Sequence, residues 1–538
     1  MSETGPRNRY STWSEATGFE WDTVVIGGGI TGAGIAREAS RLGLSVLLIE
    51  QKDFAWGASS RSSKMIHGGL RYLKERQIQL TREAVREREL LLRTGKGLVE
   101  PLRFLYLVYK GDHPGPWTLD FGLTIYDLLR RNSINHHHLD AYDIVLLAPN
   151  LKLDGLRGGF GYSDAQTDDA RLVFRVLREA EVQGARTLNY TRAKELLQDN
   201  SGNVRALTVE DVENGNIAEI RTRSVVSAAG AWSGELSKPS EDPIHLRPLR
   251  GSHLIFPWEK LPTAQAVTFA HPEDNRPVFA YPWEGVTLVG TTDLDHQDSL
   301  DKEPTASMEE ENYLLEAISS RFKDLSVSLE DLLGTFAGVR PVVLGGYDNP
   351  SQEPREYVIR EDKNLITVAG GKLTTFHPIS RRVVHALQVV LGGKYLTENN
   401  TVSLEPPDPH ALEEARETLS TLPHLLRRRL TGRLGPDLAD FLEWVDVRDL
   451  QKISDTPYTW AELKWAFSRE SVIHLDDLLL RRVRLGHLLP EGGLALETEI
   501  QTRLKSEDGW NPDRWESEWN RYRELWETCY SPTPMGQS

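Results

Sequence analysis

The sequence predicts an α/β fold joined to a C-terminal helical domain. Three observations lead to this prediction. Residues 22–50 read as a strand, a glycine-rich turn, a helix and a second strand, which together make a βαβ unit. Residues 365–390 repeat the order of strand, glycine pair and helix. After about residue 400 the composition shifts to helical patterns rich in Leu, Arg and Trp.

The composition restricts the classes of function. The 538 residues are enough for two or three domains. Lys and Arg number 63 and Asp and Glu number 79, and the resulting net charge of −16 disfavours nucleic acid as a partner. The single cysteine, Cys529, excludes a disulfide framework, a cysteine-rich zinc site and an iron–sulfur cluster held by this chain alone.

The N-terminus and the hydropathy pattern indicate the compartment. Residues 1–21 are polar and contain no apolar stretch of the kind that a secretory signal needs. No run approaches 18 apolar residues, so we expect no transmembrane span. The prediction is a cytoplasmic protein, with attachment to a membrane surface left open.

The remaining elements follow from local patterns along the chain. Residues 1–20 are rich in Ser, Thr, Glu and Arg and are expected to be a disordered lead-in. Glycine and proline separate the short apolar runs of residues 246–295, as is typical of an antiparallel sheet. The other expected segments are helices at 75–95 and 168–199, an apolar and aromatic segment at 101–131, strands at 203–229 and a linker at 406–410.

The first turn carries a dinucleotide-binding pattern. Gly27 permits the tight turn, Gly29 lets a pyrophosphate approach the backbone, and Gly32 lets the helix pack closely on the strand. The helix N-terminus then offers unpaired N–H groups to the phosphates. Glu50 ends the second strand and is positioned to accept hydrogen bonds from ribose hydroxyls, which favours a ribose without a 2′-phosphate.

Two later segments favour FAD over NAD. The strand in 224–236 stops at Gly230, and residues 365–376 form a strand, a glycine pair and a helix start. Each segment alone is an ordinary strand–turn–helix. Together they add two further elements to the same sheet, which suits a flavin bound along its whole length.

Several blocks resemble those of one enzyme family. They are "ASSRSSKMIHGGLRYL" (58–73), "GSHLIFP" (251–257), "GTTD" (290–293), "GVRP" (338–341), "GGKLTT" (370–375) and the helical segment 458–482. This set is similar to the FAD-dependent, quinone-linked glycerol-3-phosphate dehydrogenases of the glycine/D-amino-acid oxidase superfamily. The block beginning "SSKMIHGGLRYL" is specific to that family, whereas the glycine fingerprint alone is not.

The resemblance implies a domain organisation. It implies a Rossmann-like, glutathione-reductase-type FAD-binding domain, an antiparallel-sheet substrate domain and a C-terminal helical domain. We expect the FAD-binding domain in residues 21–75, 150–235 and 355–395, the substrate domain in 76–149 and 236–354, and the helical domain in 400–538.

The resemblance also implies a reaction and its residues. The family oxidises sn-glycerol 3-phosphate to dihydroxyacetone phosphate by hydride transfer to flavin N5. Such a site must stabilise a developing alkoxide and must hold a phosphate, for which arginine is well suited. The implied substrate contacts are Arg71, Tyr72, Arg340, Arg355 and Lys372, and His253 lies near the reacting carbon as the candidate base beside Arg340.

The family resemblance further implies non-covalent FAD. The expected cofactor contacts are Gly27, Gly29, Gly32, Glu50, Ser59, Ser60, Ser62, Ser63, Lys64, His67, Gly230, Gly371, Lys372, Leu373 and Thr374. The run of histidines at 136–138 invites a metal interpretation. Adjacent histidines point in different directions and no Cys or acidic partners cluster with them, so we predict no metal site.

An electron acceptor and a membrane surface follow from the same resemblance. A quinone-linked enzyme has to touch the bilayer, which implies peripheral attachment to the cytoplasmic membrane. Two segments suit an interface, namely 101–131 with its aromatic and basic residues and the helix from Thr375 with Arg381, Arg382 and His385. The alternatives are core packing for these segments and, for the function, an FAD-dependent hydroxy-acid or amino-acid oxidase, an oxygen-using glycerol-3-phosphate oxidase or a flavoprotein without turnover. The sequence does not indicate the oligomeric state, and a homodimer is compatible with it.

Overall fold

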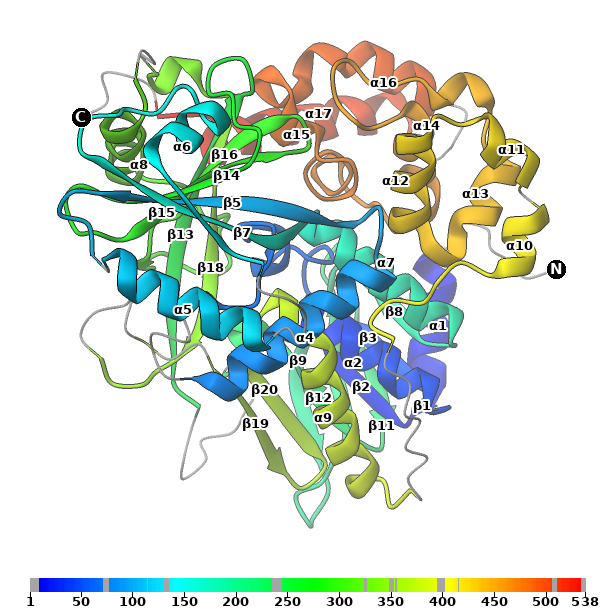
Figure 1. Ribbon diagram of the computed structural model, residues 1–538. Helices are drawn as coiled ribbons and strands as arrows, with labels where there is room; N and C mark the ends of the chain where they lie inside the picture. The colour runs from blue at the N-terminus through cyan, green and yellow to red at the C-terminus, as the bar shows by residue number, and fades with distance from the viewer. Residues whose placement is uncertain are drawn as a thin grey trace.

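The computed structural model describes residues 9–533 with gaps at 71–76, 114, 130–134, 235–243, 324–326, 348–352, 354–355, 394–401, 415 and 506–509. The described elements form a six-stranded sheet, a ten-stranded sheet, a small four-stranded sheet and a group of C-terminal helices (Figure 1). The predicted α/β fold with a helical C-terminal domain is confirmed.

The six-stranded sheet is built around the predicted βαβ unit. Its order is β19-β20-β12-β2-β3-β8, with β19 antiparallel to β20 and the other pairs parallel. Strands β2 and β3 are short and fully buried, so both of their faces must be covered. The strands are β2 (Thr23–Ile26), β3 (Val46–Ile49), β8 (Arg186–Leu188), β12 (Val225–Ser227), β19 (Tyr357–Asp362) and β20 (Leu365–Gly370).

Helices cover one face of this sheet and the four-stranded sheet covers the other. Val25 packs with the helices, whereas Val24 and Ile26 pack against the four-stranded sheet, as the alternation of side chains along a strand requires. The helices are α2 (Ile30–Arg41), α7 (Asp169–Val182) and α9 (Phe376–Val390). The four-stranded sheet has the order β1 (Glu20–Trp21), β11 (Ile217–Thr222), β10 (Val204–Asp211) and β9 (Thr191–Gln198).

The ten-stranded sheet stands beside these layers and contains the predicted antiparallel segment. Strand β13 (Leu246–Pro257) pairs with β16 (Val286–Gly290), β17 (Leu294–Asp295) and β18 (Gly334–Val343). The path continues through β15 (Pro277–Trp283), β14 (Ala266–Ala270), β5 (Val99–Tyr109), β7 (Leu156–Thr167) and β4 (Met65–Ile66), with β6 (His137–Leu139) on β7. Its helices are α4 (Ile78–Thr94), α5 (Pro116–Leu129), α6 (Ala141–Leu147) and α8 (Met308–Arg321).

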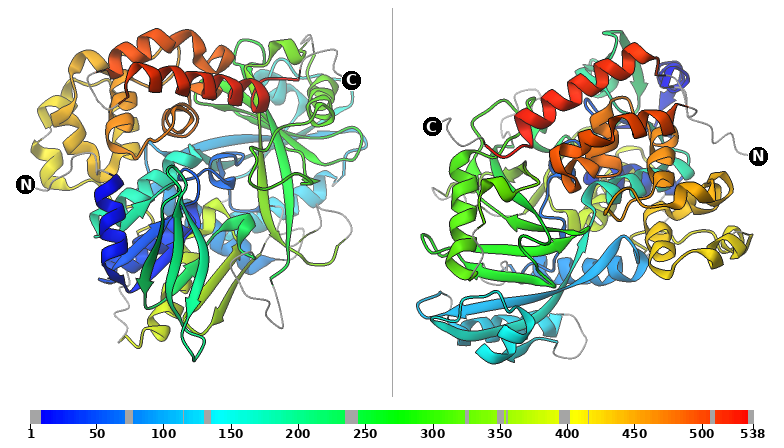
Figure 2. Two further views of the ribbon diagram at one scale, coloured as in Figure 1. Left: turned by 180° about the vertical axis from the view of Figure 1, so that it is seen from behind. Right: turned by 90° about the horizontal axis from the view of Figure 1, so that it is seen from above.

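The C-terminal helices lie at the top of the molecule in Figure 1, where they contact helix α7 and strand β18 of the ten-stranded sheet (Figures 1 and 2). Their aromatic residues share one buried cluster with the ten-stranded sheet, in which Tyr458, Trp519 and Tyr522 join Phe104 and Trp283. The helices are α10 (Pro409–Glu414), α11 (Arg416–Thr421), α12 (His424–Leu434), α13 (Leu438–Trp444), α14 (Trp460–Arg469), a π-helix (Asp477–Arg482), α15 (Leu485–Leu488), α16 (Glu497–Leu504) and α17 (Pro512–Cys529).

The expected disordered lead-in is wrong where the structure describes it. Helix α1 (Arg9–Gly18) lies against β11 of the four-stranded sheet and β8 of the six-stranded sheet. It is held by an ion pair of 2.5 Å between Arg9 and Asp211 and by Trp21, whose indole N–H donates to the Ala16 carbonyl oxygen. Tertiary contacts therefore overcome a polar composition.

Two other expectations need correction. The helix predicted at 168–199 ends at Val182, because Gly184 adopts a φ of +102° and the chain returns as β8 and β9. Strand β7 was expected in the FAD-binding domain, within 150–235, but it pairs along its length with β5 in the ten-stranded sheet. Among the described residues, no helix combines the length and the apolar character that a bilayer crossing requires.

Candidate functional site

The glycine turn between β2 and α2 has the shape of a phosphate cradle. Gly27 has a φ of +114°, and a Cβ there would lie 2.4 Å from the Ala228 carbonyl oxygen. A Cβ on Gly32 would lie 1.9 Å from the Gly27 carbonyl oxygen, so the helix can approach the turn only with glycine here. Gly29 is the N-cap of α2, whose first amides have no intrahelical acceptor. The turn fits a ligand phosphate.

Glu50 lies directly behind this turn. Its carboxylate accepts hydrogen bonds from the Gly28 N–H at 2.7 Å and the Lys52 N–H at 2.9 Å. Burial raises the pKa of Glu50, although these backbone donors oppose the shift. Each oxygen keeps a further lone pair, so the carboxylate can still accept a ribose hydroxyl as predicted.

The serine-rich loop after β3 meets the helix start from the other side. Ser59 Oγ accepts a hydrogen bond of 3.0 Å from the Ile30 N–H in the first turn of α2. Ser62 donates from its N–H and its hydroxyl to Asp169, at 2.9 and 2.7 Å. The loop therefore lies between the helix start of α2 and the first residue of α7, next to the space that a dinucleotide would occupy.

Lys64 is fully buried at the end of this loop. Its ammonium donates to the Ser60 carbonyl oxygen at 3.0 Å and to Asp169 at 3.1 Å, and it lies 4.7 Å from the centre of the Phe336 ring. Burial lowers the pKa of Lys64 to about 8, and Asp169 limits the shift. The charge is thus already compensated by the protein, and Lys64 supports the loop.

His253 on β13 reaches the same loop from the ten-stranded sheet. Its Nε2 lies 2.9 Å from Ser63 Oγ, and its ring stacks on Phe336 with centroids 4.6 Å apart. A Cβ on Gly290 would lie 2.2 Å from this ring, so the neighbouring strand also needs glycine. Burial, with the nearby Arg340 and Lys64 cations, holds the pKa of His253 well below its usual value. The imidazole is therefore neutral at ordinary pH.

Arg340 lies on β18 opposite Leu249, four residues before His253 on the paired strand β13. Its guanidinium donates to Asp293 at 2.9 Å and to Thr291 Oγ1 at 3.0 Å. Thr291 directly follows Gly290 in the chain. A Cβ on Gly251 would lie 2.1 Å from this guanidinium. About 31% of the side chain is exposed, so the group is fixed by the protein yet accessible to a ligand.

The predicted segment 365–376 borders the site where β20 ends and α9 begins. Gly371 has a φ of +93°, and Lys372 and Leu373 lead into α9. Thr374 Oγ1 donates to the His67 carbonyl oxygen at 3.3 Å, which joins this segment to the end of the serine-rich block. Burial lowers the pKa of His67. Gly230 lies at the end of β12, the strand between β2 and β20.

The structure therefore joins the glycine turn to described residues of five of the quoted blocks, namely 58–73, 251–257, 290–293, 338–341 and 370–375. The predicted residues Arg71, Tyr72 and Arg355 lie outside the described residues. The histidine run does not form one cluster, since His136 lies 2.7 Å from Asp127 through Nδ1, while His137 and His138 are exposed on β6. The roles of the individual site residues stay predictions.

Sequence reasoning missed the carboxylates and arginines that hold the loop in place. Asp169 also accepts a hydrogen bond from Arg484 of the C-terminal helices. Asp53, three residues after Glu50, accepts from Asn189 at 3.1 Å and from Arg482 at 2.9 Å. The only signal was three arginines within four residues at 481–484, a pattern that normally indicates a solvated surface.

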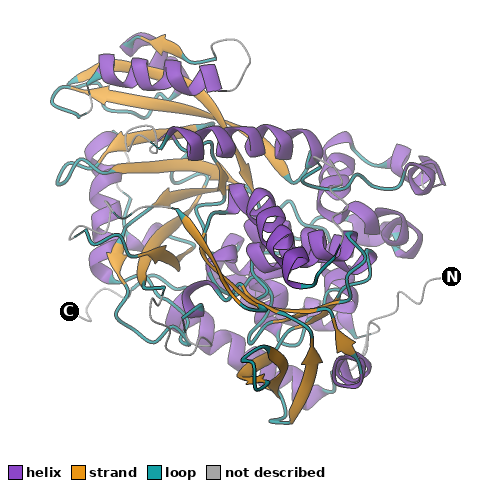
Figure 3. Cartoon of the chain, turned by 90° about the horizontal axis from the view of Figure 1, so that it is seen from below, coloured by secondary structure: helices purple, strands orange, loops and turns teal. Residues whose placement is uncertain are grey.

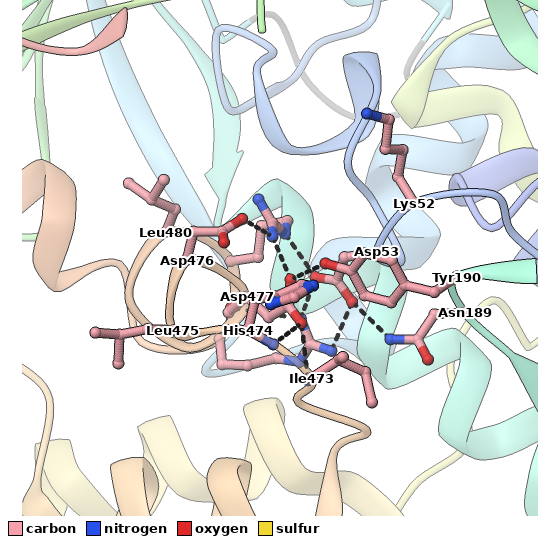
Figure 4. Close-up of polar contacts among 12 residues, drawn as sticks. Lys52, Asp53, Asn189, Tyr190, Ile473, His474, Leu475, Asp476, Asp477 and Leu480 are labelled. Carbon is pink, nitrogen blue, oxygen red and sulfur yellow. Dashed lines mark hydrogen bonds and ion pairs between the residues drawn. The ribbon is translucent and has the colours of Figure 1, made fainter. Parts of the chain in front are cut away.

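Figure 4 shows the centre of this network, where Asp53 and Asp477 lie close together. Asp477 accepts hydrogen bonds from the Tyr190 hydroxyl at 2.7 Å and from the Ile473 and His474 N–H groups at 2.9 Å. Burial, with Asp53 nearby, raises the pKa of Asp477 to about 6. The C-terminal helices thus attach to the segment that directly follows Glu50.

Comparisons with known proteins agree with this geometry. A family model of FAD-dependent oxidoreductases matches residues 22–386, and a model of the C-terminal domain of alpha-glycerophosphate oxidase matches residues 408–515. The aerobic glycerol-3-phosphate dehydrogenase of Staphylococcus haemolyticus is 40% identical over 484 residues, and that of Staphylococcus saprophyticus is 33% identical over 487 residues. Each of these two alignments covers 86% of both chains.

Solved structures share the fold. The glycerol-3-phosphate dehydrogenase from Bacillus halodurans, complexed with FAD, superposes with a TM-score of 0.78 at 24% identity and covers 99% of this chain and 100% of its own. The L-alpha-glycerophosphate oxidase from Mycoplasma pneumoniae, with FAD bound, gives a TM-score of 0.57 at 19% identity and covers 71% of this chain and 98% of its own. The cofactor of this chain is FAD, as the glycine turn and the two later segments predicted.

Replacing Arg484 with methionine should weaken both folding and FAD retention. The change leaves Asp168 and Asp169 buried without one of their cations, and breaking a buried ion pair costs about 3–5 kcal/mol. We expect a lower unfolding midpoint in denaturant and a lower ratio of flavin to protein after gel filtration. Arg428→Met is the matched control, because Arg428 pairs with Glu100 at an exposed site where such pairs contribute little. Equal behaviour of the two variants would refute the structural role of Arg484.

Proposed function

The chain belongs to the FAD-dependent glycerol-3-phosphate dehydrogenases, and from this membership we propose that it oxidises sn-glycerol 3-phosphate to dihydroxyacetone phosphate and passes the electrons to a membrane quinone. The observation that carries the proposal is the juxtaposition of His253, Ser63 and Arg340 where the serine-rich loop meets β13 and β18. A neutral base and a fixed cation at one point are what oxidation of a secondary alcohol needs.

In this proposal the protein prepares the alcohol for oxidation. When bound, FAD supplies the two-electron acceptor, with N5 receiving the hydride. His253 takes the hydroxyl proton, and Arg340 stabilises the negative charge that develops on the substrate oxygen. Ser63 and Phe336 fix the plane of the imidazole. Arg71, Tyr72, Arg355 and Lys372 are proposed to hold the rest of the substrate and its phosphate.

A second candidate is oxidation with oxygen as the acceptor. The Mycoplasma relative is named an oxidase, and its fold is shared. The staphylococcal relatives, named dehydrogenases, match over more of this chain at higher identity. This difference favours a dehydrogenase over an oxygen-using oxidase.

The surface that we propose for the membrane lies on α5. Trp117, Phe121 and Leu128 repeat on one side of this helix and are 88%, 66% and 68% exposed. Such a row of large apolar side chains is unusual on a surface that faces only water. By contrast, Phe104, Tyr109 and Tyr126 of the same predicted interfacial segment, 101–131, are buried in the core.

Helices α4 and α9, which carry basic residues, lie on the same side of the molecule as α5. Helix α4 packs against α5. Arg382 of α9 reaches α4, where its guanidinium pairs with Glu83. Figures 1 and 3 show α4, α5 and α9 on one side of the molecule. An apolar helix face beside cationic side chains suits peripheral binding to the cytoplasmic membrane. The proposal leaves the oligomeric state, including a homodimer, undetermined.

Anaerobic reduction tests the substrate. We expect sn-glycerol 3-phosphate to bleach the flavin absorbance of the purified protein, and glycerol or amino acids to leave it unchanged. Arg340→Gln should keep the flavin bound and lower kcat/KM by at least about a hundredfold, because a fixed cation at a developing oxyanion contributes on the order of 3 kcal/mol. An unchanged flavin spectrum with sn-glycerol 3-phosphate would exclude the proposed substrate, and loss of flavin from Arg340→Gln would assign Arg340 a structural role.

The pH dependence tests His253 as the base. Its pKa is lowered in the fold, so the neutral form persists below the ordinary imidazole pKa of about 6.5. Activity should therefore remain as the pH falls through 6.5 and be lost only when the lowered pKa is reached. The measurement is the pH profile of kcat with an artificial acceptor at saturating substrate. His253→Gln should lower kcat and abolish the loss of activity at low pH that the original protein shows. If that loss persists in the variant, another group causes it and His253 is not the base.

Vesicle binding tests the proposed membrane surface. Trp117→Ser with Phe121→Ser should reduce co-sedimentation with vesicles containing phosphatidylglycerol by about tenfold or more, since two large apolar contacts are lost. Activity with a water-soluble acceptor should stay unchanged. Leu425→Ser is the matched control, because Leu425 is 79% exposed on α12 in the C-terminal helices. Binding that survives the double substitution, or activity that is wholly unattached in cell fractions before any wash, would exclude this surface.

A further inference from the structure

A cleft lies between α4 and α9, and neither the glycine turn nor His253 contributes to its lining. It has a volume of about 330 Å³ and is bordered by the middle of α4 and the first turns of α9. Four arginines line it, with Arg82 and Arg86 on α4 and Arg381 and Arg382 on α9. Because i and i+4 residues share a helix face, the two arginines of α4 lie one above the other along the cleft.

The acidic residues of the cleft are already engaged. Glu83 pairs with Arg382 at 3.1 Å, and Glu87 accepts from Ser403 at 3.1 Å and lies 3.1 Å from His377 Nδ1. Within the described part of the chain, Arg82, Arg86 and Arg381 make no hydrogen bond or ion pair. Four arginines and two glutamates give the cleft lining a net charge of +2, in a protein whose net charge is −16, with histidine counted as neutral in both.

A buried histidine forms part of the cleft wall. His377 lines the cleft, is only 2% exposed and sits in the first turn of α9. Its Nδ1 faces Glu87, while its buried Nε2 has no hydrogen-bond partner among the described residues. A buried polar atom without a partner is uncommon in native proteins and points to a ligand or water that completes it.

We propose that this cleft binds a phosphate-bearing anion. Guanidinium groups match phosphate oxygens in geometry and charge, and Arg82, Arg86 and Arg381 line the cleft without a carboxylate partner among the described residues. The volume is at the lower end of the range for small-ligand sites, which suits a phosphate group with a short organic extension. The same chemistry is offered by a free phosphate ester and by a phospholipid headgroup. The inference does not depend on the reaction proposed above, since none of these residues is placed at the site of oxidation.

The test compares the original holoenzyme with the double variant Arg86→Gln/Arg381→Gln. The matched control is Arg93→Gln, because Arg93 lies on α4 outside the cleft. Binding of inorganic phosphate and of dihexanoyl phosphatidylglycerol is measured by titration calorimetry with the oxidation site saturated by dihydroxyacetone phosphate. We expect the double variant to lose about tenfold or more in affinity for at least one probe, since two charge-assisted contacts are removed. Arg93→Gln should bind as the original protein does.

The pattern of loss identifies the source of the anion. A loss seen with dihexanoyl phosphatidylglycerol alone assigns the cleft to a lipid headgroup, and a loss seen with inorganic phosphate assigns it to a free phosphate compound. The KM for sn-glycerol 3-phosphate with an artificial acceptor should stay the same in all three proteins. The proposal is overturned if neither probe binds the original protein, if both bind the double variant equally well, or if Arg93→Gln shows the same loss. A failure of oxidation with intact phosphate binding would count against the proposed reaction alone.

Discussion

The buried ion pairs between the C-terminal helices and the residues around the serine-rich loop constrain the rest of the structure. Asp53 and Asp169 are fully buried, and each needs cations that lie more than 300 residues further along the chain. Burial alone would raise the pKa of Asp53, but Arg482 and Arg481 outweigh it and hold that pKa below its usual value. Charges taken out of water in this way are tolerated only when they are paired with good geometry. The two parts of the chain therefore have to fold against each other.

This constraint explains why the helical domain is attached so firmly. Its π-helix contributes Arg481 and Arg482, and the turn that follows contributes Arg484, whose backbone adopts a left-handed conformation with a φ of +52°. Wider helical turns of this kind are found most often where a function depends on them. Here the irregular segment directs three neighbouring guanidiniums into the interior. The apolar cluster of Tyr458, Trp519 and Tyr522 with the ten-stranded sheet adds contact area around them.

Local sequence patterns were sufficient for the parts of the site that are built from adjacent residues. The phosphate turn could be predicted from the glycines at 27, 29 and 32 and the acid at 50. These residues belong to one turn and its two flanking strands, so the local sequence determines how they are arranged. The pairing of Ser63 with His253 joins residues 190 positions apart, and only the resemblance to a family suggested that the two blocks meet. No pattern predicted that Arg484 is buried, because a run of arginines has the composition of an exposed surface. Helix α1 was missed for the same reason, since a polar sequence gives no sign of the contacts that Arg9 and Trp21 make.

The serine-rich loop connects these observations. Its beginning is tied to the helix start of α2 through Ser59, its middle to Asp169 through Ser62, and its end to His253 through Ser63. Asp169 is in turn held by Arg484. A displacement of the C-terminal helices would therefore move the serine-rich loop and the imidazole of His253, which we propose as the base. Since a misplacement of about 1 Å at a reacting centre can cost a hundredfold in rate, residues of the helical domain can affect the chemistry without touching substrate or flavin.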